Sequence, residues 1–235
     1  KNADYGSTND LGANTTKKRT ISGTGEQEVA WADVLEAMRL NGISKLVFSS
    51  SATYYGNQEG LMTEEQKSQA ISLYGFSKIA DEALISAYSN LFGIKAWIYR
   101  FGNVIGGRMG HGVIYDFINK LKNNPEKLNI IGDGKQSKPY FLVEDCIDGM
   151  ICGKNFPPDT YNLAPMNYTT VDEIAEVVIG EMGLRRVKLV HSPSPKYDAP
   201  IVRLDSTKIQ KLGWQPSHTS IEAVRIATRR LLGKK

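Results

Sequence analysis

Residues 46–56, LVFSSSATYYG, and residues 73–78, LYGFSK, decide the fold of this 235-residue chain. The first stretch is an apolar run that ends in a cluster of hydroxyl side chains, and residues 45–49 predict a short buried strand. In the second stretch, Tyr74 and Lys78 are four residues apart at the start of a predicted helix, so they share one helix face. A hydroxyl donor, an ionisable phenol and a lysine can together move a proton to or from an alcohol.

Helices and strands alternate around these stretches. An apolar period of about 3.6 predicts helices over residues 28–40 and 74–92, each closed by a glycine. Residues 94–99 predict a second buried strand. Helix, glycine stop and buried strand make one step of an α/β fold with a parallel sheet. Ligands bind at the carboxyl ends of such strands, and Ser51 and Asn103 each follow one of these ends.

The second half of the chain holds shorter elements. Residues 106–112 contain four glycines, which predict either a flexible hinge or a lid over a ligand. Thr170 and Glu173 form a capping box that begins a helix, and residues 192–200, with three prolines, predict a loop. Further strands are predicted over residues 128–131, 140–143 and 161–163, and further helices over residues 113–121, 144–152, 206–212 and 220–232.

Composition limits the class of protein. A hydrophobic content of 41% and a charged content of 23% are ordinary for a soluble globular domain. A net charge of +4 favours an anionic small molecule and is too weak to indicate a nucleic-acid partner. We see no apolar run near the roughly 20 residues that a membrane helix needs, and no signal segment. Cys146 and Cys152 do not share a helix face, so they predict reduced thiols, no metal site and a cytoplasmic protein.

The chemistry of the pair follows from its groups. A phenol ordinarily loses its proton near pH ~10, and a neighbouring ammonium group stabilises the phenolate. Such a tyrosine can take a proton from an alcohol while a hydride leaves the same carbon for a nicotinamide. The lysine can also bind the nicotinamide ribose, and a nearby serine can hold the substrate oxygen in line. A tyrosine and a lysine at this spacing are common on surface helices, so the pair alone is a weak signal.

The order and spacing of the motifs are more specific. The chain resembles the extended short-chain dehydrogenase/reductase family, the NAD-dependent epimerases and dehydratases of nucleotide sugars, and within it the archaeal UDP-glucose 4-epimerase-like proteins. The resemblance covers roughly residues 28–232. It rests on residues 48–56, on the Tyr74–Lys78 pair, on RFGNVIG at 100–106, on IIGDGKQ at 130–136, on VED at 143–145, on YNL at 161–163 and on LGWQP at 212–216.

The resemblance implies a set of site residues. The catalytic residues are Ser51, Tyr74 and Lys78. The residues that bind the cofactor, NAD, are Ser49, Ser50, Tyr74, Lys78 and Phe101. The residues that bind a UDP-sugar are Ser51, Thr53, Asn103, Gly112, Val113, Lys138 and Arg203. Lys138 stands where the family has an arginine, and Arg203 is a nearby substitute for another arginine that the family places in the loop at 192–200.

The implied architecture is α/β, with a parallel Rossmann-type sheet whose N-terminal half is either truncated or left out of this sequence, and a smaller α+β C-terminal substrate domain. The family begins with a strand, G-x-x-G-x-x-G and a helix, and we find no match to that pattern before Ser51. Residues 1–105 are expected to form the remainder of the dinucleotide-binding domain and residues 106–235 mainly the substrate domain, with 140–163 returning to the Rossmann sheet. The family also implies a homodimer through the Tyr74 helix and the helix before it.

The function that the sequence favours is a UDP-glucose/UDP-galactose 4-epimerase, with Tyr74 as the acid and base. A 4,6-dehydratase carries an Asp-Glu pair directly after the catalytic hydroxyl, and Ala52-Thr53 stand there instead. A nucleotide-sugar reductase has less support. The alternative from another class is a non-catalytic remnant that binds a nucleotide sugar but cannot hold NAD.

Overall fold

The computed structural model describes residues 25–153, 155–193 and 203–234. Its helices are α1 (Gly25–Leu40), α2 (Leu73–Phe92), α3 (Val113–Asn123), α4 (Val143–Gly153), α5 (Val171–Glu181), α6 (Thr207–Lys211) and α7 (Ser220–Leu231), with a 3-10 turn, η2 (Ala52–Tyr54). Its strands are β1 (Lys45–Ser51), β2 (Lys95–Phe101), β3 (Asn103–Ile105), β4 (Lys127–Ile131), β5 (Ser137–Lys138), β6 (Tyr140–Leu142), β7 (Thr160–Leu163), β8 (Thr169–Thr170) and β9 (Lys188–Ser192). The predicted α/β fold is confirmed.

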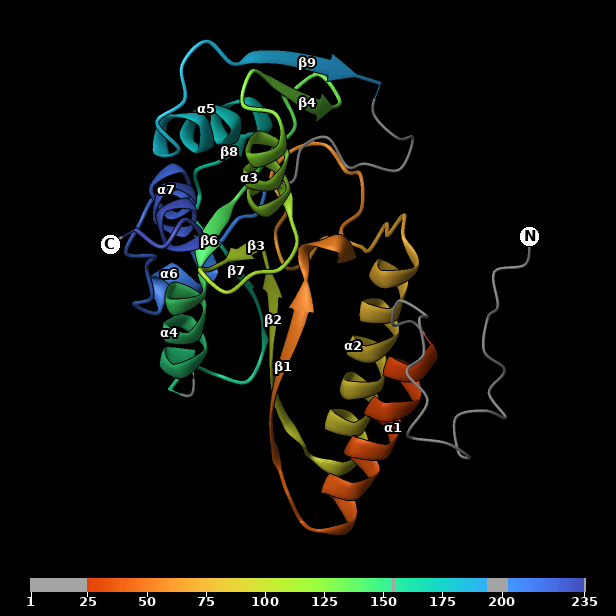
Figure 1. The fold of residues 1–235 in the computed structure, drawn as a ribbon. Coiled ribbons are helices and arrows are strands. Elements are labelled where there is room, and N and C mark those ends of the chain that lie inside the picture. Colours follow the sequence, from red (N-terminus) through yellow and green to blue (C-terminus); the bar gives the residue numbers. More distant parts are fainter. Residues whose placement is uncertain (1–24, 154, 194–202, 235) are drawn as a thin grey trace, which may run out of the picture.

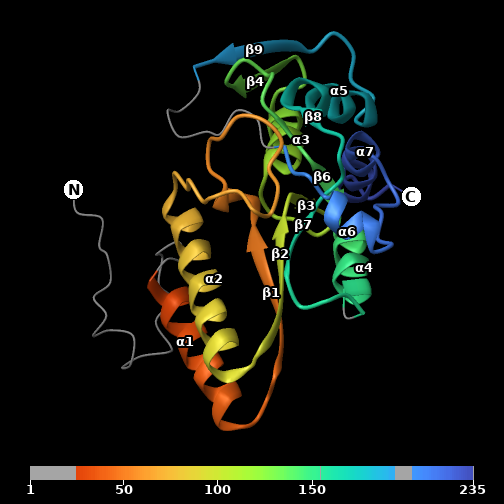
Figure 2. The ribbon, with the colours of Figure 1, turned by 180° about the vertical axis from the view of Figure 1, so that it is seen from behind.

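The largest sheet is parallel, in the order β1-β2-β7. Helices α1 and α2 lie on one side of it and α4 on the other, as Figures 1 and 2 show from opposite directions. The register pairs Ser51 with Phe101 and Phe101 with Leu163, so three strand ends lie side by side. These ends form the edge at which a parallel sheet binds its ligands.

Helix α2 has clear start and stop signals. Ser72 caps its N-terminus by accepting a hydrogen bond from the Gly75 amide at 3.1 Å, and Gly93 closes it in the left-handed conformation at φ 72°. The helix packs on β1 and α1 through a core that includes Leu35, Phe48 and Ile85, all at most 1% exposed. This core fixes the Tyr74 helix against the strand that ends at Ser51.

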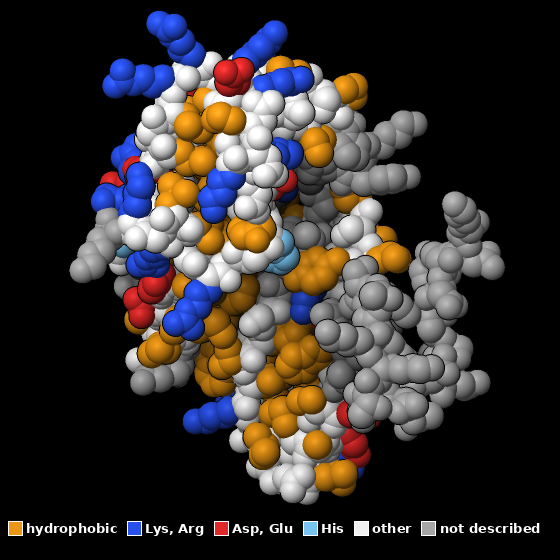
Figure 3. Space-filling view, in the orientation of Figure 1, with side chains coloured by type: hydrophobic (Ala, Val, Ile, Leu, Met, Phe, Trp, Pro, Cys, Tyr) orange, Lys and Arg blue, Asp and Glu red, His pale blue; other side chains and the backbone are white. Residues whose placement is uncertain are grey.

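The prediction that β1 is a buried strand is wrong for one of its faces. Leu46, Phe48 and Ser50 are buried toward the helices, whereas Val47 is 43% exposed on the opposite face. Figure 3 shows hydrophobic side chains gathered in the lower half of the molecule, where β1 and β2 lie in Figure 1. Strand residues alternate between faces, and among the described residues β1 pairs with one strand only, so its other edge is open.

A second core lies between the sheet and α4 and α6, and includes Tyr99, Phe141 and Trp214. A third core joins α3, α5 and α7 around β6, in the upper half of Figure 1. β7 returns to the first sheet beside β2, whereas β6 pairs with β3. Short strands β3, β5, β8 and β9 were not predicted, and most of the predicted loop at 192–200 lies outside the described residues. None of the described helices is long and apolar enough to cross a bilayer.

Candidate active site

The carboxyl end of β1 places its three serines on two faces. Ser49 and Ser51 point to the face opposite α2, whereas Ser50 is 3% exposed and points toward α2. The Ser50 hydroxyl donates a hydrogen bond to Glu82 Oε1 at 2.5 Å. The Ser50 hydroxyl is therefore occupied by a hydrogen bond inside the protein. Because consecutive strand residues alternate between faces, Ser50 does not share the face of Ser49 and Ser51.

The turn after β1 orients the Ser51 hydroxyl. Ser51 Oγ accepts a hydrogen bond from the Thr53 amide at 3.2 Å and another from Thr53 Oγ1 at 3.0 Å. Both bonds use the Ser51 oxygen as acceptor, so they leave its hydrogen to be donated. Thr53 is exposed beside it. The two hydroxyls thus form a small polar group at the end of the strand.

The first turn of α2 lies directly on this turn. A Cβ on Gly75 would come within 2.8 Å of the Thr53 carbonyl oxygen, so only glycine permits this close approach. Tyr74 precedes it and is 45% exposed. The predicted hydroxyl and phenol groups are thus brought to neighbouring segments at one end of the sheet.

Lys78 lies one helical turn below Tyr74 and is 8% exposed. Its Nζ lies 5.8 Å from the centre of the Tyr74 ring and 4.8 Å from that of the Phe48 ring. Asp81 Oδ2 is 3.6 Å from the same nitrogen, in an ion pair within the helix. The ammonium group is therefore held near the ring of the accessible phenol.

A buried polar network stands behind these groups, and the sequence analysis missed it. Arg100 on β2 forms an ion pair with Glu82 on α2 at 2.7 Å, and it donates a hydrogen bond to the Tyr55 hydroxyl at 2.9 Å. Burial raises the pKa of Tyr55 to about 12. Tyr55 in turn donates to Asn162 Oδ1 at 2.7 Å. An arginine within an apolar strand was the signal that could have indicated this network.

Three of the residues that were predicted to bind the UDP-sugar line a separate pocket of about 280 Å³. Gly112, Val113 and Lys138 line it together with Ile131 and others. Asn103 lies on β3, which pairs with β6, and its backbone amide donates to the carbonyl of Pro139, the residue after Lys138, at 2.8 Å. Four of the predicted substrate residues are thus brought to one region between the strand ends and α3.

Arg203 is placed differently. It is not among the residues that line this pocket, and its guanidinium lies 5.8 Å from the centre of the Tyr168 ring. Its carbonyl accepts a hydrogen bond from the Met62 amide at 2.8 Å. Phe101 lies beside Ser51 in the sheet register, where the prediction expects the nicotinamide.

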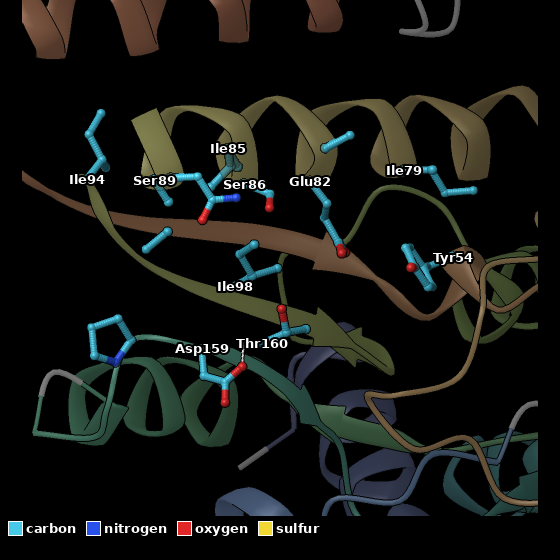
Figure 4. A pocket seen from close by; sticks show the side chains of 14 residues that line it. Tyr54, Ile79, Glu82, Ile85, Ser86, Ser89, Ile94, Ile98, Asp159 and Thr160 are labelled. Atoms are coloured by element: carbon cyan, nitrogen blue, oxygen red, sulfur yellow. Dashed lines mark hydrogen bonds between the residues drawn. The ribbon is translucent and has the colours of Figure 1, made fainter. Parts of the chain in front are cut away.

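A larger pocket, of about 580 Å³, lies beside the buried network, and Tyr54 and Glu82 are part of its lining (Figure 4). It runs between α2 and the edge of the sheet, with Ile79 and Ser86 on the helix side and Ile98 and Asp159 on the other. Ser51, Tyr74 and Lys78 are not part of its lining. Because this pocket holds none of the proton-transfer groups, the strand ends remain the candidate site.

Comparison with known proteins places the chain among nucleotide-sugar enzymes. The family profile described as GDP-mannose 4,6 dehydratase matches residues 24–227. A Methanocaldococcus jannaschii protein that carries a provisional UDP-glucose 4-epimerase name is 32% identical over 190 residues, which are 78% of this chain and 62% of the relative. A GDP-mannose 3,5-epimerase of Arabidopsis thaliana is 26% identical, over 83% of this chain and 55% of the relative.

Solved structures agree with these relatives. A UDP-galactose 4-epimerase is 35% identical with a TM-score of 0.81, over 89% of this chain and 70% of that one. The UDP-glucose 4-epimerase of Thermus thermophilus, in complex with NAD, is 27% identical with a TM-score of 0.79, over 88% and 70%. The chain spans roughly half to two thirds of the length of the curated relatives it matches, 62% and 55% in the two cases above.

Proposed function

This chain belongs to the GDP-mannose 4,6-dehydratase family of NAD-dependent nucleotide-sugar epimerases and dehydratases, and from that membership we propose that it is a UDP-sugar 4-epimerase. The observation that carries the proposal is the packing of the Ser51–Thr53 turn against the first turn of α2. This packing collects a hydroxyl, a phenol and an ammonium group at the carboxyl ends of parallel strands. The substrate class is UDP-glucose and UDP-galactose.

Each residue has a role at the sugar C4 hydroxyl. Tyr74 removes the proton from the hydroxyl oxygen and later returns it, and its 45% exposure leaves the phenol open to a sugar. Lys78 stabilises the phenolate from below, with Nζ 5.8 Å from the ring centre. Ser51 donates its hydrogen to the same sugar oxygen and holds it in line. Between the two proton steps the 4-keto sugar turns over, so that C4 is reduced from its other face.

The described residues fit the nicotinamide end of NAD. Tyr74 and Lys78 supply a hydroxyl and a buried ammonium for the ribose hydroxyls, Phe101 flanks the strand end, and Ser49 is exposed on the same face as Ser51. Ser50 contributes through its backbone, since its hydroxyl is bonded to Glu82. When bound, NAD supplies the acceptor for the C4 hydride and then its donor.

The nucleotide end of the substrate is assigned to the pocket at Gly112, Val113 and Lys138. We assign Lys138 in this pocket to a phosphate. Asn103 pairs in the sheet with Tyr140, which lines the same pocket. Thr53 binds the sugar beside Ser51, and Arg203, which lies outside the lining of this pocket, is the second residue assigned to the nucleotide.

Two residues favour epimerisation over dehydration. Ala52, 7% exposed, and Thr53 follow Ser51 in the places where a dehydratase carries an acid pair, so these positions offer no carboxyl group to eliminate water from the sugar. A dTDP-glucose 4,6-dehydratase is among the solved structures of similar fold, and dehydration is therefore the competing reaction in the test.

We also propose that the protein is a homodimer through α1 and α2. The two helices pack together, with the Tyr88 hydroxyl donating to Glu36 at 3.2 Å and Arg39 lying over the Phe92 ring at 5.3 Å. Their outer faces carry exposed apolar side chains, including Val34 at 44%, Phe76 at 56% and Leu91 at 73%. A second copy of the same helix pair is the partner that buries such a surface symmetrically.

The test measures bound cofactor and product together. The purified protein is analysed by mass spectrometry for NAD and then incubated with UDP-galactose, and the sugars are separated by chromatography. Conversion to UDP-glucose supports the proposal. A 4-keto-6-deoxy sugar would instead identify a dehydratase, and failure to bind NAD at millimolar supply would identify a non-catalytic remnant.

A further inference from the structure

We propose that Arg100 is a positioning residue that fixes the Ser51 turn relative to the Tyr74–Lys78 helix. The proposal rests on the proposed function, and it assigns a role to a side chain outside the set that touches substrate or cofactor. Arg100 is 4% exposed and lies on β2, one residue before Phe101. Its guanidinium contacts three segments, which are α2, the turn after Ser51 and the loop between that turn and α2.

The first contact is with the catalytic helix. Arg100 Nε and Nη2 donate to the two oxygens of Glu82 at 3.0 and 2.7 Å, which is the two-pronged geometry that a guanidinium forms with a carboxylate. Glu82 is 8% exposed and lies one helical turn after Lys78 on the same face. The Ser50 hydroxyl donates to the same carboxylate at 2.5 Å. Glu82 is thus bonded at once to β2 and to the residue before Ser51.

The second contact is with the turn that follows Ser51. Arg100 Nη1 donates to the Tyr55 hydroxyl at 2.9 Å, and the guanidinium carbon lies 3.5 Å from the centre of the Tyr54 ring. Figure 4 shows Tyr54, from the turn after β1, and Glu82, from α2, pointing into the same pocket. One rigid planar group therefore holds the turn from one side and the helix from the other.

The third contact is with the loop between the turn and the helix. Arg100 Nη1 also donates to the Glu64 carbonyl at 3.1 Å. Beyond Tyr55, the Asn162 side-chain amide donates to the Met62 carbonyl at 2.8 Å and to the Asp205 carbonyl at 3.0 Å. The same network thus extends to the backbone of Asp205, two residues after Arg203.

These contacts specify position as well as charge. A lysine at position 100 would keep the positive charge near Glu82 but would lack the planar fork that reaches the helix, turn and loop together. The turn and the helix could then shift relative to each other. Because a misplacement of about 1 Å can cost roughly 100-fold in rate, catalysis should respond more strongly than substrate binding.

Four proteins test the proposal: wild type, Arg100→Lys, Tyr55→Phe and Tyr99→Phe. Tyr99 is the matched control, because it is also fully buried on β2 and its hydroxyl makes no hydrogen bond among the described residues. The measurements are kcat and KM for UDP-galactose, with active protein counted by its bound NAD. We expect Arg100→Lys to lower kcat roughly 10- to 100-fold with KM within about 3-fold. Tyr55→Phe should lower kcat roughly 3- to 10-fold and Tyr99→Phe less than about 2-fold.

An unchanged kcat in Arg100→Lys, or an equal loss in Tyr99→Phe, would overturn the proposal. Backbone hydrogen exchange separates it from the proposed function. In Arg100→Lys, amides of residues 51–56 and 73–78 should exchange faster while those of α5 keep their protection. If wild type converts no UDP-sugar, the proposed function fails, and faster exchange confined to these two segments still supports the positioning role. Unchanged exchange there would refute it.

Discussion

The Lys78 ammonium nitrogen lies 5.8 Å from the centre of the Tyr74 ring, with the lysine buried and the phenol accessible. This relationship brings an ammonium group close to a phenol that is open to a ligand. The helix enforces it, because the two side chains are one turn apart.

The first prediction removes the phenolic hydroxyl. Tyr74→Phe should lower kcat for UDP-galactose by roughly 100- to 10,000-fold, because the proton at the C4 oxygen then has no acceptor. Bound NAD, measured by mass spectrometry, should change little. Tyr115→Phe, on a partly exposed tyrosine of α3, is the control and should keep its turnover. Turnover near the wild-type rate in Tyr74→Phe would refute the assigned role.

A second prediction concerns stability. Glu82→Gln should lower the free energy of unfolding by about 3–5 kcal/mol, because Arg100 would keep a buried charge without its carboxylate. Urea unfolding followed by circular dichroism measures this. Glu144→Gln is the control, since its 2.7 Å pair with Arg230 is exposed and such pairs contribute about 0–1 kcal/mol. A similar small loss in both variants would mean that the buried pair does not stabilise the fold.

The elements that the sequence predicted are those with local signals. The capping box of Thr170 and Glu173 is present at the start of α5, and the glycine stop of α2 lies at Gly93. In contrast, β9 becomes a strand because it pairs with β4, about 60 residues away, and a local pattern does not contain that partner. The sequence placed Ser51 and Tyr74 in one site because the order of their motifs resembles that of a known family.

The buried network was missed for a different reason. Arg100 is unusual in an apolar strand, but Glu82 is ordinary in a helix, and only the packing of α2 on β2 brings the two together as an ion pair. The inward direction of Ser50 could have been predicted, since it alternates with Ser49 and Ser51. The hydrogen-bond partner of Ser50 could not have been predicted, because whether its hydroxyl meets solvent or Glu82 depends on which helix covers the strand.

The third prediction is a pH dependence at Glu64. Burial raises the pKa of this carboxyl above its ordinary value of 4.5, and the Asn162 amide, which donates to it at 2.7 Å, opposes part of the effect. A raised folded-state pKa stabilises the protein below the unfolded-state value, and that stability is lost as pH rises through the folded-state value. The stability of wild type relative to Glu64→Gln should therefore fall as pH rises above about 4.5. Urea midpoints from pH 4 to 7 measure this, and a difference that is flat or grows with pH would contradict it.

The fourth prediction tests the proposed dimer. Leu91→Glu places a charge on the outer face of α2, where Leu91 is 73% exposed, and should shift the protein toward monomer in light scattering. Leu212→Glu, at a leucine that is 40% exposed outside α1 and α2, should leave the mass unchanged. A wild-type mass of one chain at all concentrations would remove the dimer proposal.

The fifth prediction addresses the nucleotide pocket. Lys138→Gln should weaken UDP binding roughly 10- to 100-fold in isothermal titration calorimetry, because a charge-assisted bond to a phosphate is lost. Lys138→Arg should retain the affinity or improve it, since its fork can bind a phosphate at two points. Raising the salt concentration should narrow the gap between wild type and Lys138→Gln, because ions screen the attraction. Lys135→Gln, on the exposed turn just before β5, is the matched control and should bind UDP like wild type. Equal losses at positions 135 and 138 would indicate a diffuse charge effect and would contradict a phosphate site at Lys138.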